Sequence, residues 1–285
     1  MEPRDQIIKH FEMVLKFAHN IYFETNERKC LDVIAKLQLI QNRIKSKEDF
    51  TITNDELAKF VLPIRDMFVE IKPTLREQLR DFWDSIAYVN ASINRKKVFT
   101  RITMFEFEKL KNMGNLSYLH SETVKKYVEN PDERSHLYAL CYCHVTRVDV
   151  FEESIKPSYE ELLLKHSLDQ KYDSNKIFSI EKTAKMKTKG KKKSITDIRA
   201  VRNCLAHYLY SINQENDWTI TFKSGEKDDE FTIYSRTFSR EEFVDFLNDS
   251  NILYQLMIML MNILSAVTYL THFAKEPLQL LPYKK

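Results

Sequence analysis

The stretch SITDIRAVRNCLAHYLYSI, residues 194–212, is the most informative part of the chain. A helix turns by about 100° per residue, and this rotation gathers the apolar side chains of the stretch on one face. These residues are Ile198, Val201, Leu205, Tyr208, Leu209 and Ile212. The sequence therefore predicts an amphipathic helix whose apolar face belongs to a protein core.

A neighbouring arc of the same helix carries cations, an amide, a phenol and an imidazole. It is roughly 140° wide by the same rotation and holds Arg199, Arg202, Asn203, Ala206, His207 and Tyr210. Arg199, Asn203 and His207 follow one another at four-residue steps, so they stack along the helix. Arg202 and His207 point in different directions, and both reach one phosphate only through the length of the arginine or through a second subunit. The alternative is a polar face that simply contacts water.

The segment RNCLAH, residues 202–207, resembles the Arg-x4-His motif of the HEPN superfamily. Many HEPN proteins are metal-independent endoribonucleases, found among toxins and abortive-infection or other antiviral-defence proteins. The resemblance covers chiefly residues 131–275 and implies that Arg202, Asn203 and His207 are catalytic. It also implies that no metal or other cofactor is needed. Some toxin members carry a tyrosine two residues past the histidine, a position that Leu209 occupies here, and whether Tyr210 substitutes stays open.

Metal-free cleavage of RNA requires the 2′-hydroxyl to lose a proton and attack the adjacent phosphorus while the 5′-oxygen leaves. An imidazole transfers protons near neutral pH, and a guanidinium stabilises charge on phosphoryl oxygens. We therefore expect proton transfer by His207, phosphate binding by Arg202 and orientation of the phosphate or imidazole by Asn203. One histidine does not easily serve as both base and acid, so we expect a homodimer that places two copies across one cleft.

The segment KTAKMKTKGKKKS, residues 182–194, comes directly before this helix and contains seven lysines and no acid. Such a run is typical of a mobile loop. Because it adjoins the Arg-x4-His segment, it is expected to attract a phosphate backbone, with an affinity that falls as salt rises. We assign RNA binding to Arg199, Tyr210, Lys187, Lys189, Lys191, Lys192 and Lys193. A loop that only keeps the protein soluble explains the lysines equally well.

The composition predicts a mainly α protein. Its 285 residues include only three glycines and seven prolines, and long mixtures of charged and apolar residues are typical of helices. The net charge of +3 is close to balance, so nucleic-acid affinity must come from local clusters. Four cysteines lack the spacing of disulfide frameworks or zinc sites, and charges interrupt the N-terminal MEPRDQIIKHF. Both features favour the cytoplasm.

The segment NPD, residues 130–132, is the best candidate for a domain boundary. It separates a helical N-terminal extension, residues 1–130, from a HEPN-like helical bundle, residues 131–285. We expect one inserted β-hairpin at residues 217–237, where apolar residues alternate, and a short helical pair around Gly114 at residues 109–130. A long helix over residues 133–153 ends with Asp149, Glu152 and Glu153. Any of these three can approach the Arg-x4-His segment, and the sequence does not choose among them.

The segment ILYQLMIMLMNILSAVTYLTHF, residues 252–273, has nearly the length and apolarity of a membrane span. Its Gln255, Asn262, Ser265 and Thr268 favour a buried helix of a bundle or a dimer face, with a tail anchor as the alternative.

The resemblance to the HEPN superfamily implies that the chain cleaves RNA into products with 2′,3′-cyclic phosphate and 5′-hydroxyl ends, under the control of a cognate antitoxin or regulatory RNA. The alternatives are a non-catalytic RNA-binding HEPN protein and a helical interaction or tail-anchored protein.

Overall fold

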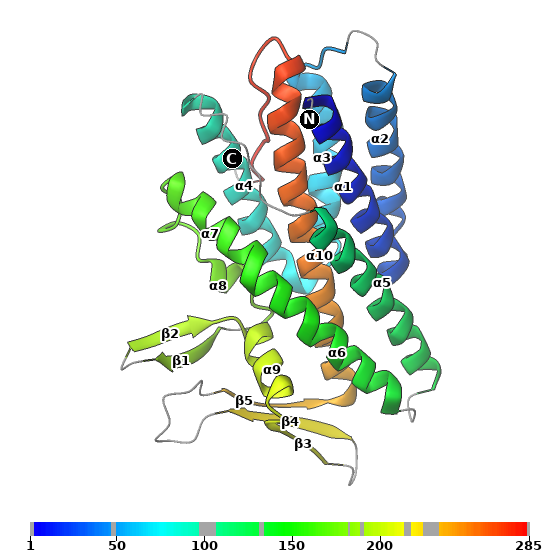
Figure 1. Cartoon of the computed structure of the whole chain (residues 1–285), viewed down its shortest axis with the longest axis vertical. Coiled ribbons are helices and arrows are strands. Elements are labelled where there is room, and N and C mark those ends of the chain that lie inside the picture. Colours follow the sequence, from blue (N-terminus) through cyan, green and yellow to red (C-terminus); the bar gives the residue numbers. More distant parts are fainter. Residues whose placement is uncertain are drawn as a thin grey trace.

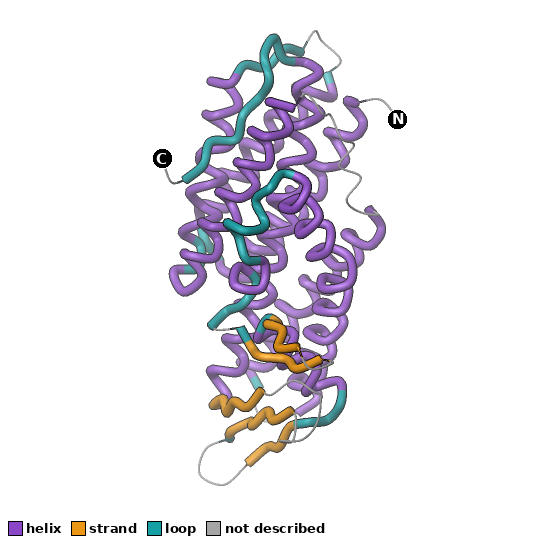
Figure 2. Tube along the Cα trace, turned by 90° about the vertical axis from the view of Figure 1, so that its left-hand side faces the viewer, coloured by secondary structure: helices purple, strands orange, loops and turns teal. Residues whose placement is uncertain are grey.

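The computed structural model describes residues 3–46, 50–96, 107–130, 134–181, 183–188, 191–213, 218–224 and 234–283. Most of these residues are helical, which confirms the predicted mainly α class. Figure 1 shows a bundle of long helices with two small sheets at one end, and Figure 2 shows the same separation from the side. The N-terminus lies at the opposite end of the bundle from the strands.

The described helices are mostly long. They are α1 (Pro3–Thr25), α2 (Arg28–Lys45), α3 (Asn54–Glu70), α4 (Arg76–Lys96), α5 (Phe107–Glu129), α6 (Arg134–Val150), α7 (Lys156–Lys165), α8 (Ser174–Ile177), α9 (Asp197–Ala206) and α10 (Arg240–Leu270). Short 3-10 turns at Pro73–Leu75 and Thr271–Phe273 precede α4 and follow α10.

Helix α10 is the central element of the bundle (Figure 1). A capping box starts it: the Ser239 hydroxyl accepts from the Glu242 amide at 3.2 Å, and the Glu242 carboxylate accepts from the Ser239 amide at 2.8 Å. The Arg240–Phe273 segment has the length and a mean hydropathy, 1.6, that would suit a membrane span, but 89% of its most apolar window is buried in the protein. The predicted buried bundle helix is confirmed, and the apolar part of α10 offers no dimer face because residues 250–268 are all buried.

The polar side chains within α10 find partners inside the bundle. Asn262 Oδ1 lies 2.8 Å from His10 Nδ1 on α1, and the hydroxyls of Ser265 and Thr268 donate to the carbonyls one turn earlier at 3.1 and 2.8 Å. Such bonds remove most of the cost of burying a polar group. These residues therefore suit a protein interior better than lipid.

The two predicted parts of the chain share one apolar core. Helix α1 packs along α10, and the C-terminal residues run beside α4. There Trp83 Nε1 donates to the Leu281 carbonyl at 3.0 Å, and Asn90 Oδ1 accepts from the Leu280 amide at 2.8 Å. The division at residues 130–132 stays a prediction, and residues 131–133 lie outside the described part.

Helix α5 is one continuous helix rather than the predicted pair. It passes through Gly114 because α1 crosses there: a side chain at this position would meet Lys16 Cε at 2.6 Å. The Gly114 carbonyl accepts from Asn20 Nδ2 at 2.8 Å, and Lys16 Nζ donates to Asn115 Oδ1 at 2.7 Å. The glycine thus marks a close approach between helices, not a break.

Helices α6 and α7 form one rod that crosses α10 in Figure 1. A π-helical turn, Phe151–Ile155, joins α6 to α7 with little change of direction. It begins near the end of the helix predicted over residues 133–153. Phe151 in this turn stacks on Tyr254 of α10 at 3.8 Å between ring centroids. A π turn inserts an extra residue into a helix, and such turns are frequent at functional sites.

The strands form two antiparallel sheets. One contains β3 (Tyr210–Asn213), β4 (Thr219–Ser224) and β5 (Tyr234–Ser239), with Ile220 opposite Phe238. The predicted hairpin at residues 217–237 is therefore present as β4 and β5, while β3 was not predicted. The other sheet pairs β1 (Ala184–Thr188) with β2 (Lys191–Ile195). It replaces the loop expected from the lysine content, because the buried Ala184 and Ile195 pair at its base.

Candidate functional site

The start of α9 is fixed by two buried polar residues. The Thr196 hydroxyl accepts from the Arg199 amide at 3.1 Å and donates to Glu152 at 3.2 Å. Asp197 is 1% exposed, and its carboxylate accepts from the Ile180 and Glu181 amides at 3.0 and 2.9 Å. These bonds tie α9 to the π turn and to the segment before β1, so its orientation is well defined.

Helix α9 ends at Ala206, much earlier than the predicted residue 212. The chain reverses in a Schellman motif: the Leu209 amide donates to the Cys204 carbonyl at 2.8 Å and the Tyr208 amide to the Leu205 carbonyl at 3.3 Å. Tyr208 has a φ of 57°, the left-handed conformation that this motif requires. The predicted apolar face is correct for Ile198, Val201 and Leu205, which are buried. It is wrong beyond the helix, since Tyr208 and Leu209 are exposed and Ile212 lies in β3.

Arg202 is held in place by two partners. Its Nη1 donates to Asn203 Oδ1 at 2.9 Å, and its Nη2 forms an ion pair with Asp149 at the end of α6. The two charged side chains are 25% and 35% exposed. Of the three acids that the sequence left open, Asp149 is therefore the one that pairs with Arg202, and it fixes the direction of the guanidinium.

Glu152 binds the second arginine. It lies in the π turn, where its side chain is only 7% exposed, and its Oε2 is 3.5 Å from Arg199 Nη1 and 3.3 Å from Lys156 Nζ. Lys156 also donates to Asn175 Oδ1 at 2.7 Å. Glu153, the third candidate acid, is exposed. The π turn thus directs neighbouring acids to different places: one toward α9 and one toward water.

His207 is the C-cap residue directly after α9, and its side chain is exposed. Its amide donates to the Asn203 carbonyl at 3.1 Å, which joins the backbone of two predicted catalytic residues. The structure therefore brings Arg202, Asn203 and His207 to the exposed C-terminal end of one short helix. An imidazole in this position is open to a ligand from solvent.

The described members of the predicted RNA-binding set lie on α9, on β3 and on the two strands β1 and β2. Arg199 is on α9 with its side chain 45% exposed, whereas Tyr210 is on β3, away from the helix. The Tyr210 ring is 6.1 Å from that of Phe222, and burial raises the pKa of its phenol. The β1–β2 pair, residues 184–195, is called the lysine hairpin below; in it Lys187 is opposite Lys192, Lys191 is opposite Thr188 and Lys193 is opposite Met186. Lys189 lies outside the described residues.

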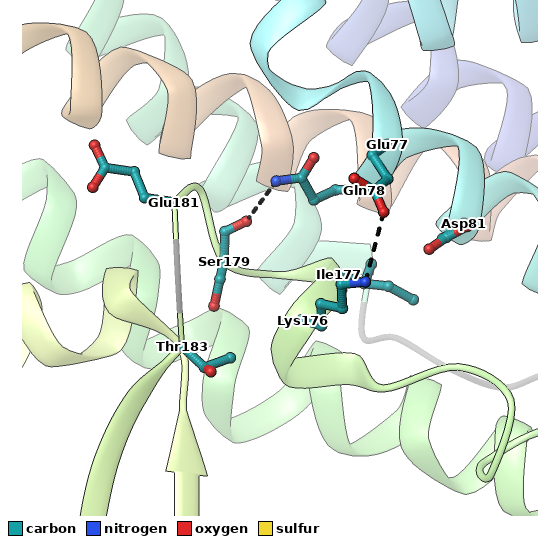
Figure 3. Close-up of a pocket in the computed structure, with 8 residues that line it drawn as sticks. All are labelled: Glu77, Gln78, Asp81, Lys176, Ile177, Ser179, Glu181 and Thr183. Carbon is teal, nitrogen blue, oxygen red and sulfur yellow. Dashed lines mark hydrogen bonds and ion pairs between the residues drawn. The ribbon is translucent and has the colours of Figure 1, made fainter.

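The two described pockets lie elsewhere. Figure 3 shows the first, about 350 Å³, where α4 faces α8 and the segment before β1. There Lys176 Nζ is 3.6 Å from Glu77 Oε1, and Gln78 Nε2 donates to the Ser179 carbonyl at 3.2 Å. The second, about 440 Å³, is lined by Val124, Tyr127, Val128, Arg240, Glu241, Val244, Asp245 and Asn248. Neither of these two pockets includes a residue of the Arg-x4-His segment.

A buried polar network that the sequence does not predict lies beneath the candidate site. It joins Arg147 and His144 of α6 to Glu24 of α1 and Ser250 of α10. Ser250 Oγ lies 3.4 Å from Arg147 Nη2 and 3.2 Å from His144 Nδ1, while Glu24 Oε2 accepts from Asn251 at 2.7 Å and from Gln255 at 3.1 Å. Arg147 Nε and Nη1 have no hydrogen-bond partner within the described part of the chain. The only sequence signal was a set of polar residues within otherwise apolar helices.

Burial changes the titration of this network. It raises the pKa of Glu24 to about 7, although Arg147 acts in the opposite direction. It also lowers the pKa of His144 well below the usual range, with help from the nearby Arg147 charge. A histidine that stays neutral in the interior is suited to structure rather than to proton transfer with a substrate.

Comparisons with known proteins give no further assignment. Within the described residues, no group of three or more His, Cys, Asp and Glu side chains is arranged to hold a metal ion. No protein-family model, no curated protein and no solved structure matches this chain.

Proposed function

We propose that this chain is a HEPN-type endoribonuclease that cleaves RNA without a metal ion, as a toxin or an effector of antiviral defence. The observation that carries the proposal is the exposed end of α9, where His207 is open to solvent and Arg202 is oriented by Asp149 and Asn203. A guanidinium held in one direction and an accessible imidazole at the end of the same short helix suit a phosphodiester substrate.

The proposed reaction uses only proton transfer and charge stabilisation. His207 takes the proton from the 2′-hydroxyl, whose oxygen bonds to the adjacent phosphorus while the bond to the 5′-oxygen breaks. The leaving 5′-oxygen takes up a proton, and the products carry a 2′,3′-cyclic phosphate and a 5′-hydroxyl. Arg202 stabilises the charge that develops on the phosphoryl oxygens, for which it exchanges part of its contact with Asp149.

A second histidine would supply the acid in this reaction, and we propose that it comes from the partner in a homodimer. Because residues 250–268 of α10 are all buried, the dimer must form through another surface. The scheme predicts that mixing His207→Ala and Arg202→Ala chains restores no more than part of the activity. Each mixed dimer lacks one His207 and one Arg202, so neither of its subunits has both residues. Cleavage by a protein that remains monomeric at the assay concentration would contradict it.

The direct test is the mapping of RNA 5′-hydroxyl ends after expression of the parent and of His207→Ala. New 5′-hydroxyl ends are expected only with the parent, and chelation of metals should leave its cleavage in vitro unchanged. His19→Ala is a matched control because His19 is exposed on α1. Equal cleavage by the parent and by His207→Ala would reject the proposal.

A second candidate function is RNA binding without cleavage. It is favoured by the double engagement of Arg202, which already contacts Asp149 and Asn203 and must release one of them to bind a phosphate fully. This candidate predicts RNA binding by the parent with no cleavage, and little loss of binding in His207→Ala. Filter binding and end mapping on the same samples separate the two functions.

A further inference from the structure

Three exposed tyrosines lie at the same end of the molecule as His207. Tyr138 and Tyr142 are on α6, and Tyr208 directly follows His207; their exposed fractions are 55%, 66% and 82%. Arg199 pairs with Glu152 and Arg202 with Asp149, so α9 runs antiparallel to the rod of α6 and the π turn, and its end points toward the earlier turns of α6, which carry Tyr138 and Tyr142. We call Tyr138, Tyr142 and Tyr208 the tyrosine surface.

Nothing in the described part of the fold uses these rings. None of the three makes a hydrogen bond, an ion pair or a ring contact there. Tyrosines in a folded protein usually bury the ring and leave the phenol at the surface. The tyrosine surface therefore exposes flat apolar area that a ligand can cover.

Tyr208 is the most informative of the three. It occupies the left-handed position of the Schellman motif, with a φ of 57°, where glycine is usual because a side chain is disfavoured. Its ring gains no described packing in return, since it is 82% exposed. A residue that costs stability without packing is expected to contribute when something binds.

We propose that the tyrosine surface stacks on unpaired bases of single-stranded RNA and so places the neighbouring phosphate at Arg202 and His207. This inference rests on the proposed function and names the bases of a single strand as what the surface recognises. Aromatic side chains stack on any base, and this gives affinity without strong sequence preference. Tyr138 and Tyr142 are one helical turn apart, a rise of about 6 Å, which suits successive bases of an extended strand.

The charges around the surface favour a nucleic acid over a second copy of the chain. Arg199 and Arg202 lie on α9, within three helical turns before Tyr208, and the lysine hairpin directly precedes this helix in the chain, so the chain that leads to Tyr208 is rich in cations that a polyanion can contact. The exposed ring area of three tyrosines is on the order of 400 Å². A stable protein interface needs roughly 800 Å² from each partner, so these rings alone are too small for one.

The test measures binding of a short fluorescein-labelled 2′-O-methyl RNA, which cannot be cleaved because its 2′-oxygens are blocked. Tyr138→Ala, Tyr142→Ala and Tyr208→Gly are each expected to weaken binding by about 5- to 100-fold, while the matching Phe variants stay within about threefold because the ring remains. The dependence of affinity on salt should not change, since the phosphate contacts are retained. Tyr118→Ala is the control, because Tyr118 is 48% exposed on α5 and rests against Phe23.

Tyr208→Gly separates binding from folding. Glycine relieves the left-handed conformation, so the variant should melt at the same temperature as the parent or higher while it binds RNA more weakly. Opposite changes in stability and affinity cannot come from a general loss of structure. A variant that binds as tightly as the parent would remove Tyr208 from the tyrosine surface.

Two outcomes overturn the inference: all three variants bind within twofold of the parent, or they bind weakly only because a dimer becomes a monomer at the assay concentration. The second outcome would identify the surface as a protein interface. Cleavage assays on unmodified RNA distinguish the two proposals. If the tyrosine variants lose affinity but the parent never cleaves, the cleavage proposal fails and the stacking remains. If the parent cleaves and the variants bind and cleave normally, only the stacking fails.

Discussion

Two regions around α6 use the same side-chain types in opposite settings. At the surface, Arg202 pairs with Asp149 next to the exposed His207. In the interior, fully buried Arg147 and His144 share Ser250 as a hydrogen-bond partner. The charge of Arg147 also acts on Glu24, where it lowers the pKa of the carboxyl against the effect of burial. Both sets combine a guanidinium, an imidazole and a carboxylate, but only one of them is accessible to solvent.

The difference shows that burial, rather than residue type, decides what such a set can do. Burial lowers the pKa of Arg147 to about 10 and that of His120, a neighbour in the network, to about 3. The interior therefore suppresses charge, and its groups stabilise the junction of α1, α5, α6 and α10. The surface set keeps each arginine beside a carboxylate and leaves the side chain of His207 exposed to solvent.

The largest effect on stability is expected for Arg147→Ala. It removes the positive charge that acts most strongly on Glu24 and opens a cavity in the core, which together should lower the free energy of unfolding by about 3–5 kcal/mol. Chemical denaturation measures this loss, with Arg147→Met as the control that keeps most of the volume. Glu24→Gln in the same chain should recover part of the loss, whereas a change below about 1 kcal/mol would show that the network carries little energy.

Arg202→Ala, in contrast, should change the stability of the protein little and its cleavage activity strongly. Its side chain is 25% exposed, so unfolding should change by less than about 1 kcal/mol. RNA cleavage should fall by about 10²- to 10³-fold, because a donor to the developing phosphoryl charge is lost. The comparison requires initial cleavage rates and melting curves on the same preparation. If Arg202→Ala instead unfolds the protein, the contrast between the two arginines disappears.

The buried set of Arg147, His144 and Glu24 should also make the stability of the protein depend on pH. Because burial raises the pKa of Glu24 from 4.5 to about 7, the folded protein keeps a proton that the unfolded chain has released. Its contribution to stability therefore falls as pH rises from about 4.5 to 7, by at most about 1.4 kcal/mol per pH unit. Glu24 faces Ser121 of α5, Asn251 and Gln255 of α10, and the charges of Arg147 and Lys72.

The buried histidines act with the opposite sign. Their lowered pKa values mean that the unfolded chain binds protons that His120 and His144 do not, so their contribution falls as pH drops below about 6.5. The difference between the parent and Glu24→Gln isolates the carboxyl: the advantage of the parent should shrink as pH rises through this window. Parallel stability curves for the two proteins would contradict the raised pKa of Glu24.

The sequence predicts most of the long helices because their apolar residues repeat with the helical period, as in α10. It does not predict the end of α9, since the residue in the left-handed position is Tyr208 rather than the glycine or asparagine that signals a helix stop. It also misses the lysine hairpin, whose apolar pair, Ala184 and Ile195, is separated by charged residues. Glu24 and Arg147 meet only through the packing of α1 against the rest of the bundle, which no local pattern records.

No local sequence pattern shows which acid near the candidate site contacts Arg202. A matched pair of substitutions tests which of these acids supports cleavage. Asp149→Asn keeps the size of the side chain but removes the charge that holds Arg202. Cleavage should fall by roughly tenfold, the lower end of what a charge-assisted hydrogen bond contributes, because both partners are partly exposed to water. Glu153→Gln changes the same charge on an exposed residue four positions later, and it should leave the rate unchanged.

The ratio of these two rates tests positioning more directly than either rate alone, because both variants lose one negative charge at the same end of α6 and the π turn. A general effect of charge on RNA affinity would raise binding in both, since the protein becomes less acidic near the substrate. A positioning role predicts instead that kcat falls in Asp149→Asn alone while KM changes little. Equal rates for the two variants would mean that Arg202 finds its working orientation from Asn203 and the substrate, without Asp149.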